Sequence, residues 1–99
     1  MLNFPLQEAW NMDKAILYKG SNKKLYFNIP QEDIKTLSED EIRSKHGLIH
    51  QYSLYDGEGE FIFWGWSNNT SNLEPLDYAK MHAGCTDIYY NNSRIPTNI

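Results

Sequence analysis

The chain has 99 residues, of which 40% are hydrophobic and 14% aromatic, and its formal net charge at pH 7 is −4. This length predicts one small domain over 1–99 and leaves no room for a second core, since single domains commonly have about 100 to 150 residues. The acidic balance disfavours direct binding to nucleic acid, because affinity for the phosphate backbone depends on lysine and arginine contacts.

Cys85 is the single cysteine, which excludes an internal disulfide and leaves a cysteine-based zinc site without partners of its own kind. We expect Cys85 to be buried as a small apolar side chain in a reducing cytoplasm. Residues 1–8 lack a basic region followed by an uninterrupted apolar stretch, and no segment approaches the roughly 20 apolar residues of a membrane span. The expected location is therefore cytoplasmic, without membrane association.

The N-terminal third predicts a short helix over 5–14 and then a hairpin. Two β-rich runs, 14–19 and 24–29, flank the turn-forming residues 20–23. Pro30 ends the second run, and the acidic residues that follow are typical of a first helical turn.

A helix is predicted over 39–46. Ser38 precedes Glu41 by three residues, the spacing of a capping box, and Gly47 suits a left-handed helix end. Its only clearly apolar member is Ile42, so we expect it to lie on the surface.

A second hairpin is predicted from the runs 48–55 and 60–66, closed by a turn at 56–59 whose two glycines can supply positive φ. A helix should follow over 74–83, with proline in its first turn and Gly84 after its end. Its expected buried side consists of Leu76, Ala79, Met81 and Ala83. A short strand over 86–90 and a loose tail over 93–99 complete the chain.

These elements predict an α+β fold. We expect an antiparallel sheet of four to five strands, built from two hairpins and a C-terminal strand, with two to three short helices mainly on one face.

The run Phe61-Ile62-Phe63-Trp64-Gly65-Trp66 is apolar on both faces of its predicted strand. Strict alternation places Phe61 and Phe63 on one face and Ile62, Trp64 and Trp66 on the other. Core packing is the expected role of the two phenylalanines. One thin layer of helices covers only one face, so Trp64 and Trp66 are candidates for either core or interface positions.

No motif with the specificity of a catalytic, phosphate-binding or metal site is visible, and we expect neither enzyme activity nor a cofactor. Alternating acids and glycines at 56–60 stop short of a twelve-residue calcium loop. His82 and Cys85 are three apart, and His46 and His50 four apart, but a glycine interrupts each pair.

Residues 31–60 hold eight acidic residues against three basic ones, a net charge of −5. Such a stretch can attract a basic partner electrostatically. Tyrosine and tryptophan side chains that lose water on contact can then supply most of the binding energy. We therefore predict a small protein-binding module that occludes a basic site on a protein partner, for example a nucleic-acid-handling protein, as inhibitors, immunity proteins and antagonists from phage or mobile elements do. The predicted partner-binding residues are Tyr55, Trp64, Trp66, Glu39, Asp40, Glu41, Asp56 and Glu58.

Two alternatives stay open. The aromatic side chains can wall a pocket for a small ligand, in a binding protein or enzyme with His50 or His82 as the polar group. An uncovered sheet face can also pair with its own copy in a symmetric homodimer.

Overall fold

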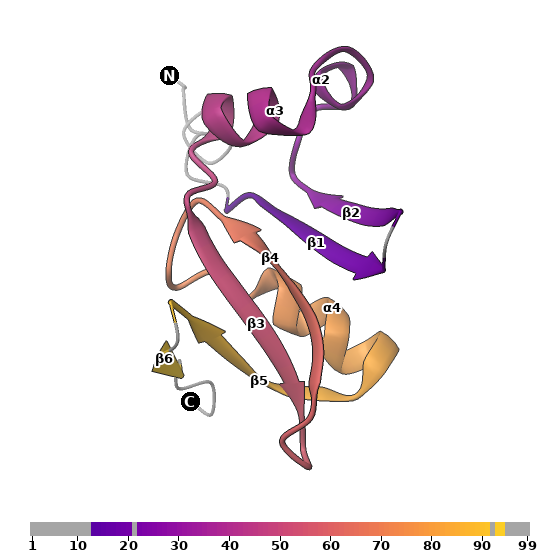
Figure 1. Ribbon diagram of the computed structural model, residues 1–99, viewed down its shortest axis with the longest axis vertical. Coiled ribbons are helices and arrows are strands. Elements are labelled where there is room, and N and C mark those ends of the chain that lie inside the picture. Colours follow the sequence, from indigo (N-terminus) through magenta and orange to yellow (C-terminus); the bar gives the residue numbers. More distant parts are fainter. Residues whose placement is uncertain (1–12, 21, 92, 95–99) are drawn as a thin grey trace, which may run out of the picture.

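The computed structural model describes residues 13–20, 22–91 and 93–94. Figure 1 shows the course of the chain through six strands and three helices in this part. The bounds are β1 Ala15–Gly20, β2 Lys23–Phe27, α2 Gln31–Thr36, α3 Glu39–His46, β3 His50–Asp56, β4 Phe61–Ser67, α4 Glu74–Ala83, β5 Cys85–Tyr90 and β6 Ser93–Arg94. The helix expected over 5–14 lies outside the described residues except for 13–14, which lead into β1 without helical structure.

All strands belong to one antiparallel sheet with the order β2-β1-β4-β3-β5-β6. Both predicted hairpins are present, and β1 joins them by pairing with β4 from Ala15↔Ser67 to Tyr18↔Trp64. The C-terminal strand β5 pairs with β3. The α+β prediction with two hairpins and a C-terminal strand is confirmed. The two-residue β6 adds a further strand at the start of the segment expected to be a loose tail.

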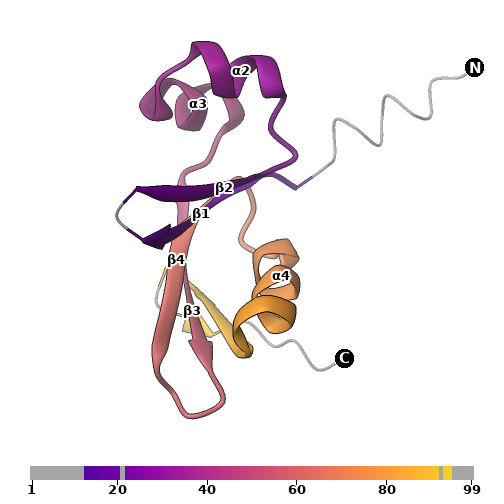
Figure 2. The ribbon, with the colours of Figure 1, turned by 90° about the vertical axis from the view of Figure 1, so that its right-hand side faces the viewer.

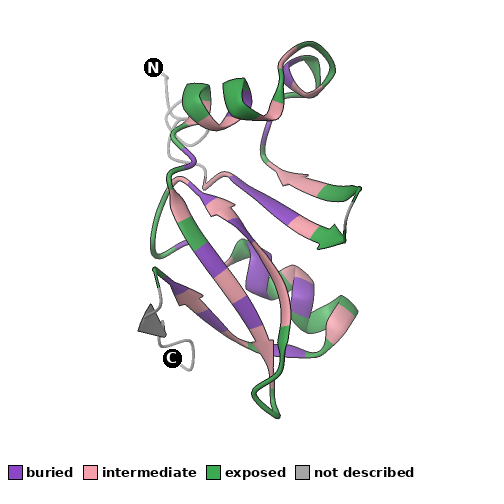
Figure 3. Ribbon diagram, in the orientation of Figure 1, coloured by how far each residue is buried: buried purple, intermediate pink, exposed green. Residues whose placement is uncertain are grey.

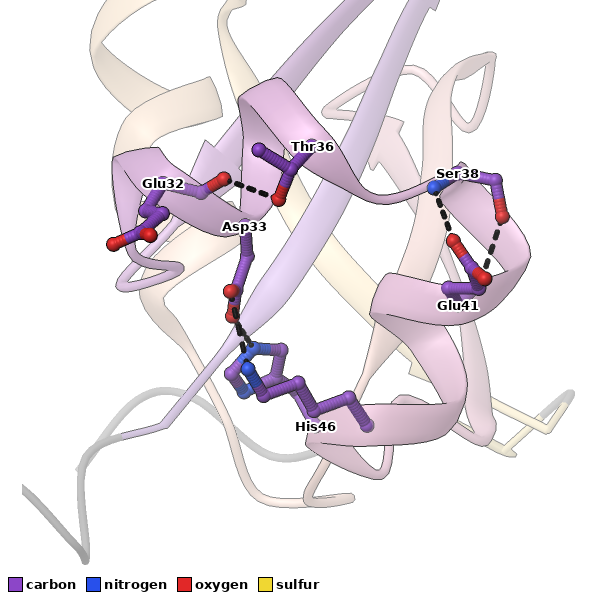
Figure 4. A network of polar contacts seen from close by, with 7 residues as sticks. Glu32, Asp33, Thr36, Ser38, Glu41 and His46 are labelled. Atoms are coloured by element: carbon purple, nitrogen blue, oxygen red, sulfur yellow. Dashed lines mark hydrogen bonds and ion pairs between the residues drawn. The ribbon is translucent and has the colours of Figure 1, made fainter.

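Helix α3 begins and ends at the predicted residues. The Glu41 amide donates to Ser38 Oγ at 3.1 Å and the Ser38 amide donates to Glu41 Oε1 at 2.9 Å, which completes the capping box (Figure 4). Gly47 ends the helix at φ 70°, where a side chain is disfavoured. Local side-chain chemistry thus fixes both ends of a helix that contributes one buried residue, Ile42, to the interior.

The larger core lies between α4 and one face of the sheet (Figure 2). Its buried members include Ala15, Leu17, Tyr52, Leu54, Leu76, Ala79, Cys85, Ile88 and Tyr90. Met81, expected on the buried side of α4, is instead 80% exposed. That prediction is wrong because Met81 follows Ala79 by two residues, about 200° around a helix of 3.6 residues per turn. Ala83, one full turn beyond Ala79, does pack against the core.

A smaller core lies at one end of the opposite sheet face. There Ile42 of α3 and Leu48 pack with Ile16 and Ile29, below the paired helices α2 and α3 (Figures 1 and 2). The prediction that the helices lie mainly on one face of the sheet holds for α4, the longest helix. Helices α2 and α3 cover one end of the other face. The expectation that the chain leaves no room for a second core is therefore wrong: because Ile16 alternates with Ala15 and Leu17, strand β1 contributes to one core on each face of the sheet.

Tyr52 connects three neighbouring strands. From β3 its hydroxyl donates to the Ile16 carbonyl oxygen on β1 at 2.8 Å, passing over Gly65 of β4. A Cβ at Gly65 would lie 2.6 Å from Tyr52 Cζ and would overlap the Ile16 carbonyl oxygen. The absence of a side chain at Gly65 is therefore what permits this crossing, and burial raises the pKa of Tyr52 well above its ordinary value.

A buried polar group holds the segment between β4 and α4. Asn72 is fully buried, and its Nδ2 donates to Ser67 Oγ at 3.1 Å while its Oδ1 accepts from the Glu74 amide at 2.9 Å. The Tyr90 hydroxyl donates to the Asn72 carbonyl oxygen at 2.8 Å. These bonds attach the start of α4 to the ends of β4 and β5, so the segment between β4 and α4 is anchored in the core.

Candidate interaction surface

A β-bulge in the second hairpin decides which aromatic side chains face outward. Leu54 pairs with Phe63, but the next residue, Tyr55, pairs with Phe61, so that Ile62 is the extra residue in β4. The bulge breaks the alternation assumed from the sequence. Phe61 consequently shares a face with Tyr55, whereas Ile62 packs with Phe63 against the larger core. The predicted faces of Phe61 and Ile62 were therefore wrong, and those of Trp64 and Trp66 were right.

Seven aromatic side chains lie on the sheet face opposite α4: Tyr26 on the edge strand β2, and six on β1, β3, β4 and β5 that we call the aromatic face. Its members are Tyr18, Tyr55, Phe61, Trp64, Trp66 and Tyr89. Tyr18 stacks on Trp64 at 4.5 Å between ring centroids, and Trp64 meets Trp66 edge to face at 6.4 Å. Phe61 is 53% exposed, which corrects the expectation that it belongs to the core. The other five are half-buried.

The fully buried aromatic side chains of the described residues are Tyr52 and Tyr90, which the sequence did not distinguish from the exposed ones. Neither Trp64, Trp66, Phe27 nor Phe63 is fully buried. No local signal identifies Tyr52 and Tyr90 as core residues, because their burial depends on strand neighbours and on polar partners far away in sequence.

Trp66 lies at the α3 end of the aromatic face and has a structural contact there. The Arg43 guanidinium lies 3.8 Å from the centre of the Trp66 ring, and Arg43 Nε donates to the Leu48 carbonyl oxygen at 3.5 Å. Trp66 also packs against the smaller core. A substitution of Trp66 would therefore change stability as well as any binding.

A shallow hollow opens beside Phe61, with a volume of about 450 Å³. It lies where β1 stops pairing with β4 after Tyr18↔Trp64 and the two strands diverge. Its lining residues are Tyr18, Lys19, Gly20, Phe61, Ile62 and Trp64. His50 and His82, the polar groups expected for a small-ligand pocket, do not line it. His82 instead packs against the Tyr78 ring at 4.3 Å between centroids.

Glu39, a predicted partner-binding residue, makes contacts within the protein. Its carboxylate forms an ion pair with Lys24 at 3.4 Å and accepts a hydrogen bond from the Tyr18 hydroxyl. Burial, followed by the bond to Glu39, raises the pKa of Tyr18. Glu39 therefore attaches α3 to the β1–β2 hairpin.

The other two acidic residues of the α3 first turn have different surroundings. The Glu41 carboxylate is part of the capping box, while the exposed Asp40 lines a second hollow of about 370 Å³ together with Arg43, Ser44, Leu48 and Ile49. Basic residues of the same helix, Arg43 and Lys45, offset this negative charge.

The hairpin turn carries the remaining predicted acids. Asp56 Oδ1 accepts hydrogen bonds from the amides of Glu58 and Glu60, both at 2.9 Å, and Gly59 takes a positive φ of 81°. Gly57 does not have positive φ, so one of the two turn glycines supplies the left-handed conformation. Glu58 and Glu60 are exposed, and Figure 3 shows the turn between β3 and β4 in the colour of exposed residues.

The acidic residues of 31–60 form two separate groups and not one patch. α3 precedes β3 and the hairpin turn follows it, so a seven-residue strand, about 23 Å long at 3.3 Å per residue, lies between them. Figure 1 shows α3 and this turn at opposite ends of the long axis. Of the predicted residues, Tyr55, Asp56 and Glu58 lie at the turn end, and Trp66, Glu39, Asp40 and Glu41 at the α3 end.

Sequence reasoning missed Asp33, which joins α2 to α3 (Figure 4). Its carboxylate lies 2.8 Å from His46 Nε2 and 3.1 Å from Lys45 Nζ, and Asp33 is 8% exposed. The hydrogen bonds from His46 and Lys45 lower the pKa of Asp33. His46 thus has a carboxylate partner on α2. The spacing between Asp33 and His46 in the sequence matches no helical pattern, so no local signal indicated this contact.

The described residues contain no group of three histidine, cysteine, aspartate or glutamate side chains able to hold a metal ion. Cys85 is buried as expected, and burial raises the pKa of its thiol, which disfavours the nucleophilic thiolate. None of the helices in the described part of the chain has the length and apolar character needed to cross a membrane.

Comparisons with protein families, with curated proteins and with solved structures find no match to this chain. The candidate surface therefore rests on the geometry of its own residues: an aromatic face, a hollow at Phe61 and an acidic turn beside it.

Proposed function

We propose that this protein is a binding module that engages a protein partner through its aromatic face. The observation that carries the proposal is Phe61, a large apolar side chain that is 53% exposed at the rim of five further aromatic rings. Contiguous apolar surface outside the core is typical of interaction sites, and tyrosine and tryptophan are enriched among residues that dominate binding energy.

The proposed mechanism is occlusion of a basic site on the partner. Aromatic anchors at Trp64, Tyr55 and Phe61 would lose water on contact, while the acidic hairpin turn would steer the approach. This role is a binding role and not a catalytic one, and it suits an inhibitor, an immunity protein or an antagonist from a phage or mobile element. We further propose a cytoplasmic location, consistent with a single cysteine that is a buried free thiol.

The test compares Phe61→Ser with Met81→Ser. Both residues are exposed large apolar side chains, but Met81 lies on α4, on the other side of the sheet. Proteins captured from a lysate of the source cell by each variant and by wild type would be identified, and affinities then measured with the purified partner. Loss of a residue that dominates the binding energy typically costs about 2 kcal/mol, so Phe61→Ser should weaken binding about thirtyfold, whereas Met81→Ser should leave it unchanged.

Circular dichroism of both variants establishes that each is folded before binding is compared. If the two substitutions affect capture equally, or if neither does, the aromatic face is not the binding surface and the proposal fails.

A further inference from the structure

The two acidic groups of this protein differ in whether nearby basic residues offset them. At the α3 end, Glu39 pairs with Lys24, and Arg43 and Lys45 follow in the same helix. At the hairpin end, Glu58 and Glu60 are exposed, and no ion pair among the described residues involves either of them. Between Lys45 and Lys80 the sequence contains no lysine or arginine at all. Of the two acidic groups, the one whose exposed carboxylates have no ion pair among the described residues is therefore the hairpin group, and Arg94 of β6 stands opposite Tyr89 in the strand pairing.

That same end carries three aromatic rings arranged edge to face. The Tyr55 ring centroid lies 5.8 Å from that of Phe61 and 5.0 Å from that of Tyr89, with interplanar angles of 72° and 68°. We call these three residues the hairpin triad. Aromatic faces attract cations that come within about 6 Å of the ring centre. The triad is therefore chemically suited to a cationic side chain. Asp56 directly follows Tyr55, Glu60 directly precedes Phe61, and Glu58 lies between them in the turn.

The one lysine that lines the neighbouring hollow does not neutralise this end. Lys19 Nζ donates to the Tyr78 hydroxyl at 2.9 Å and lies 5.5 Å from the centre of that ring, which belongs to α4. Its charge is thus held at α4, on the side of the sheet opposite the hairpin triad.

We propose that the hairpin triad binds an arginine- or lysine-bearing segment of the protein partner, with the cation against the rings of Phe61 and Tyr55 and its charge balanced by Glu58 and Glu60. This inference rests on the proposed function and assigns the partner's chemistry at one end of the same surface. Charge complementarity selects a basic segment, since a second copy of this acidic chain would bring like charges together.

A matched pair of peptides tests the chemistry directly. Acetyl-(Arg-Gly)3-amide would be titrated into the ¹⁵N-labelled protein, alongside the same peptide with citrulline, a neutral isostere, in place of arginine. We expect the arginine peptide to shift the amide resonances of Gly57, Gly59 and Phe61, with Gly47, at the end of α3, unmoved as an internal control. Absence of shifts at the turn, or equal shifts with the citrulline peptide, would overturn the proposal.

A pair of charge variants tests the residues. Glu58→Gln with Glu60→Gln should weaken binding of the arginine peptide about fivefold, the size expected for two exposed charge contacts. The control, Glu32→Gln with Asp77→Asn, changes the net charge equally at exposed positions on α2 and α4, and should have little effect. An equal loss in both double variants would mean that only the overall charge matters, which also contradicts the proposal.

The captured partner separates this inference from the proposed function. If capture depends on Phe61 but is unchanged by Glu58→Gln with Glu60→Gln, the aromatic face binds a partner and the basic-segment assignment is wrong. If capture does not depend on Phe61, the proposed function itself fails.

Discussion

At Gly65 the fold leaves no room for a side chain. The Tyr52 hydroxyl crosses above it to reach the Ile16 carbonyl oxygen, and any Cβ would meet both groups. Strands β1, β4 and β3 are therefore held together at a point where β4 contributes only backbone. In the sequence, Gly65 only interrupts an aromatic run. Strand propensities do not reveal that the Tyr52 side chain of a neighbouring strand passes over this glycine.

We predict that Gly65→Ala lowers the free energy of unfolding by about 2 to 4 kcal/mol, because it overpacks a buried site and displaces a buried hydrogen bond. Urea unfolding followed by fluorescence measures this change. Gly20→Ala is the matched control, since Gly20 has no atom within 4 Å of the added Cβ and no positive φ. Similar stabilities for the two variants would show that the Tyr52 crossing is easily rearranged.

At the scale of elements, the pair α2–α3 depends on a titratable contact. Asp33 on α2 accepts hydrogen bonds from His46 and Lys45 on α3, and these lower its pKa in the folded protein. The pKa of an unfolded aspartate is about 3.9. The ionised carboxylate therefore stabilises the folded state above that pH, and this contribution is lost as the pH falls through the lowered folded-state pKa.

We predict that wild type loses stability more steeply than Asp33→Asn on acidification below about pH 4. Urea unfolding at a series of pH values between about 2 and 6 gives both profiles, and carboxylates common to the two proteins affect both equally. Parallel profiles would show that the Asp33 contact contributes nothing to stability.

Elements whose ends are set by neighbouring residues were predictable from sequence, and those set by distant strands were not. Ser38 with Glu41 and Gly47 fix α3, and the residues from Asp56 to Gly59 fix the hairpin turn, all by local chemistry. The bulge at Ile62 arises only when β4 pairs with β3, so the exposure of Phe61 could not be read from alternation. The candidate site was thus predicted in its residue types but not in its arrangement.

At the scale of the whole molecule, strand β1 unites two cores of unequal size. Ala15 and Leu17 face α4, and Ile16 faces the smaller core below α2 and α3. The distance between the acidic residues of α3 and those of the hairpin turn also depends on the whole fold. It is set by the length of β3, although the two groups are close in sequence.

We predict that the protein unfolds in one cooperative transition despite its two cores, because neither core can lose β1 without disturbing the other. Far-ultraviolet circular dichroism reports all helices and strands, and tryptophan fluorescence is sensitive to Trp66 beside the smaller core. The two probes should give coincident urea midpoints. An earlier fluorescence midpoint would indicate that α2 and α3 separate first.

The extra residue in β4 also bears on how this surface is inherited. Phe61 faces outward because one more residue stands in β4 than in the paired segment of β3. An in-frame deletion of the Ile62 codon would make Phe61 and Phe63 consecutive, with Phe63 still opposite Leu54 and Phe61 still opposite Tyr55, so that regular alternation would keep the exposed ring facing outward and remove one side chain from the larger core. Loss of this one codon would therefore thin the core and spare the aromatic surface, which is inherited through the pairing of β4 with β3 and not through Ile62 itself.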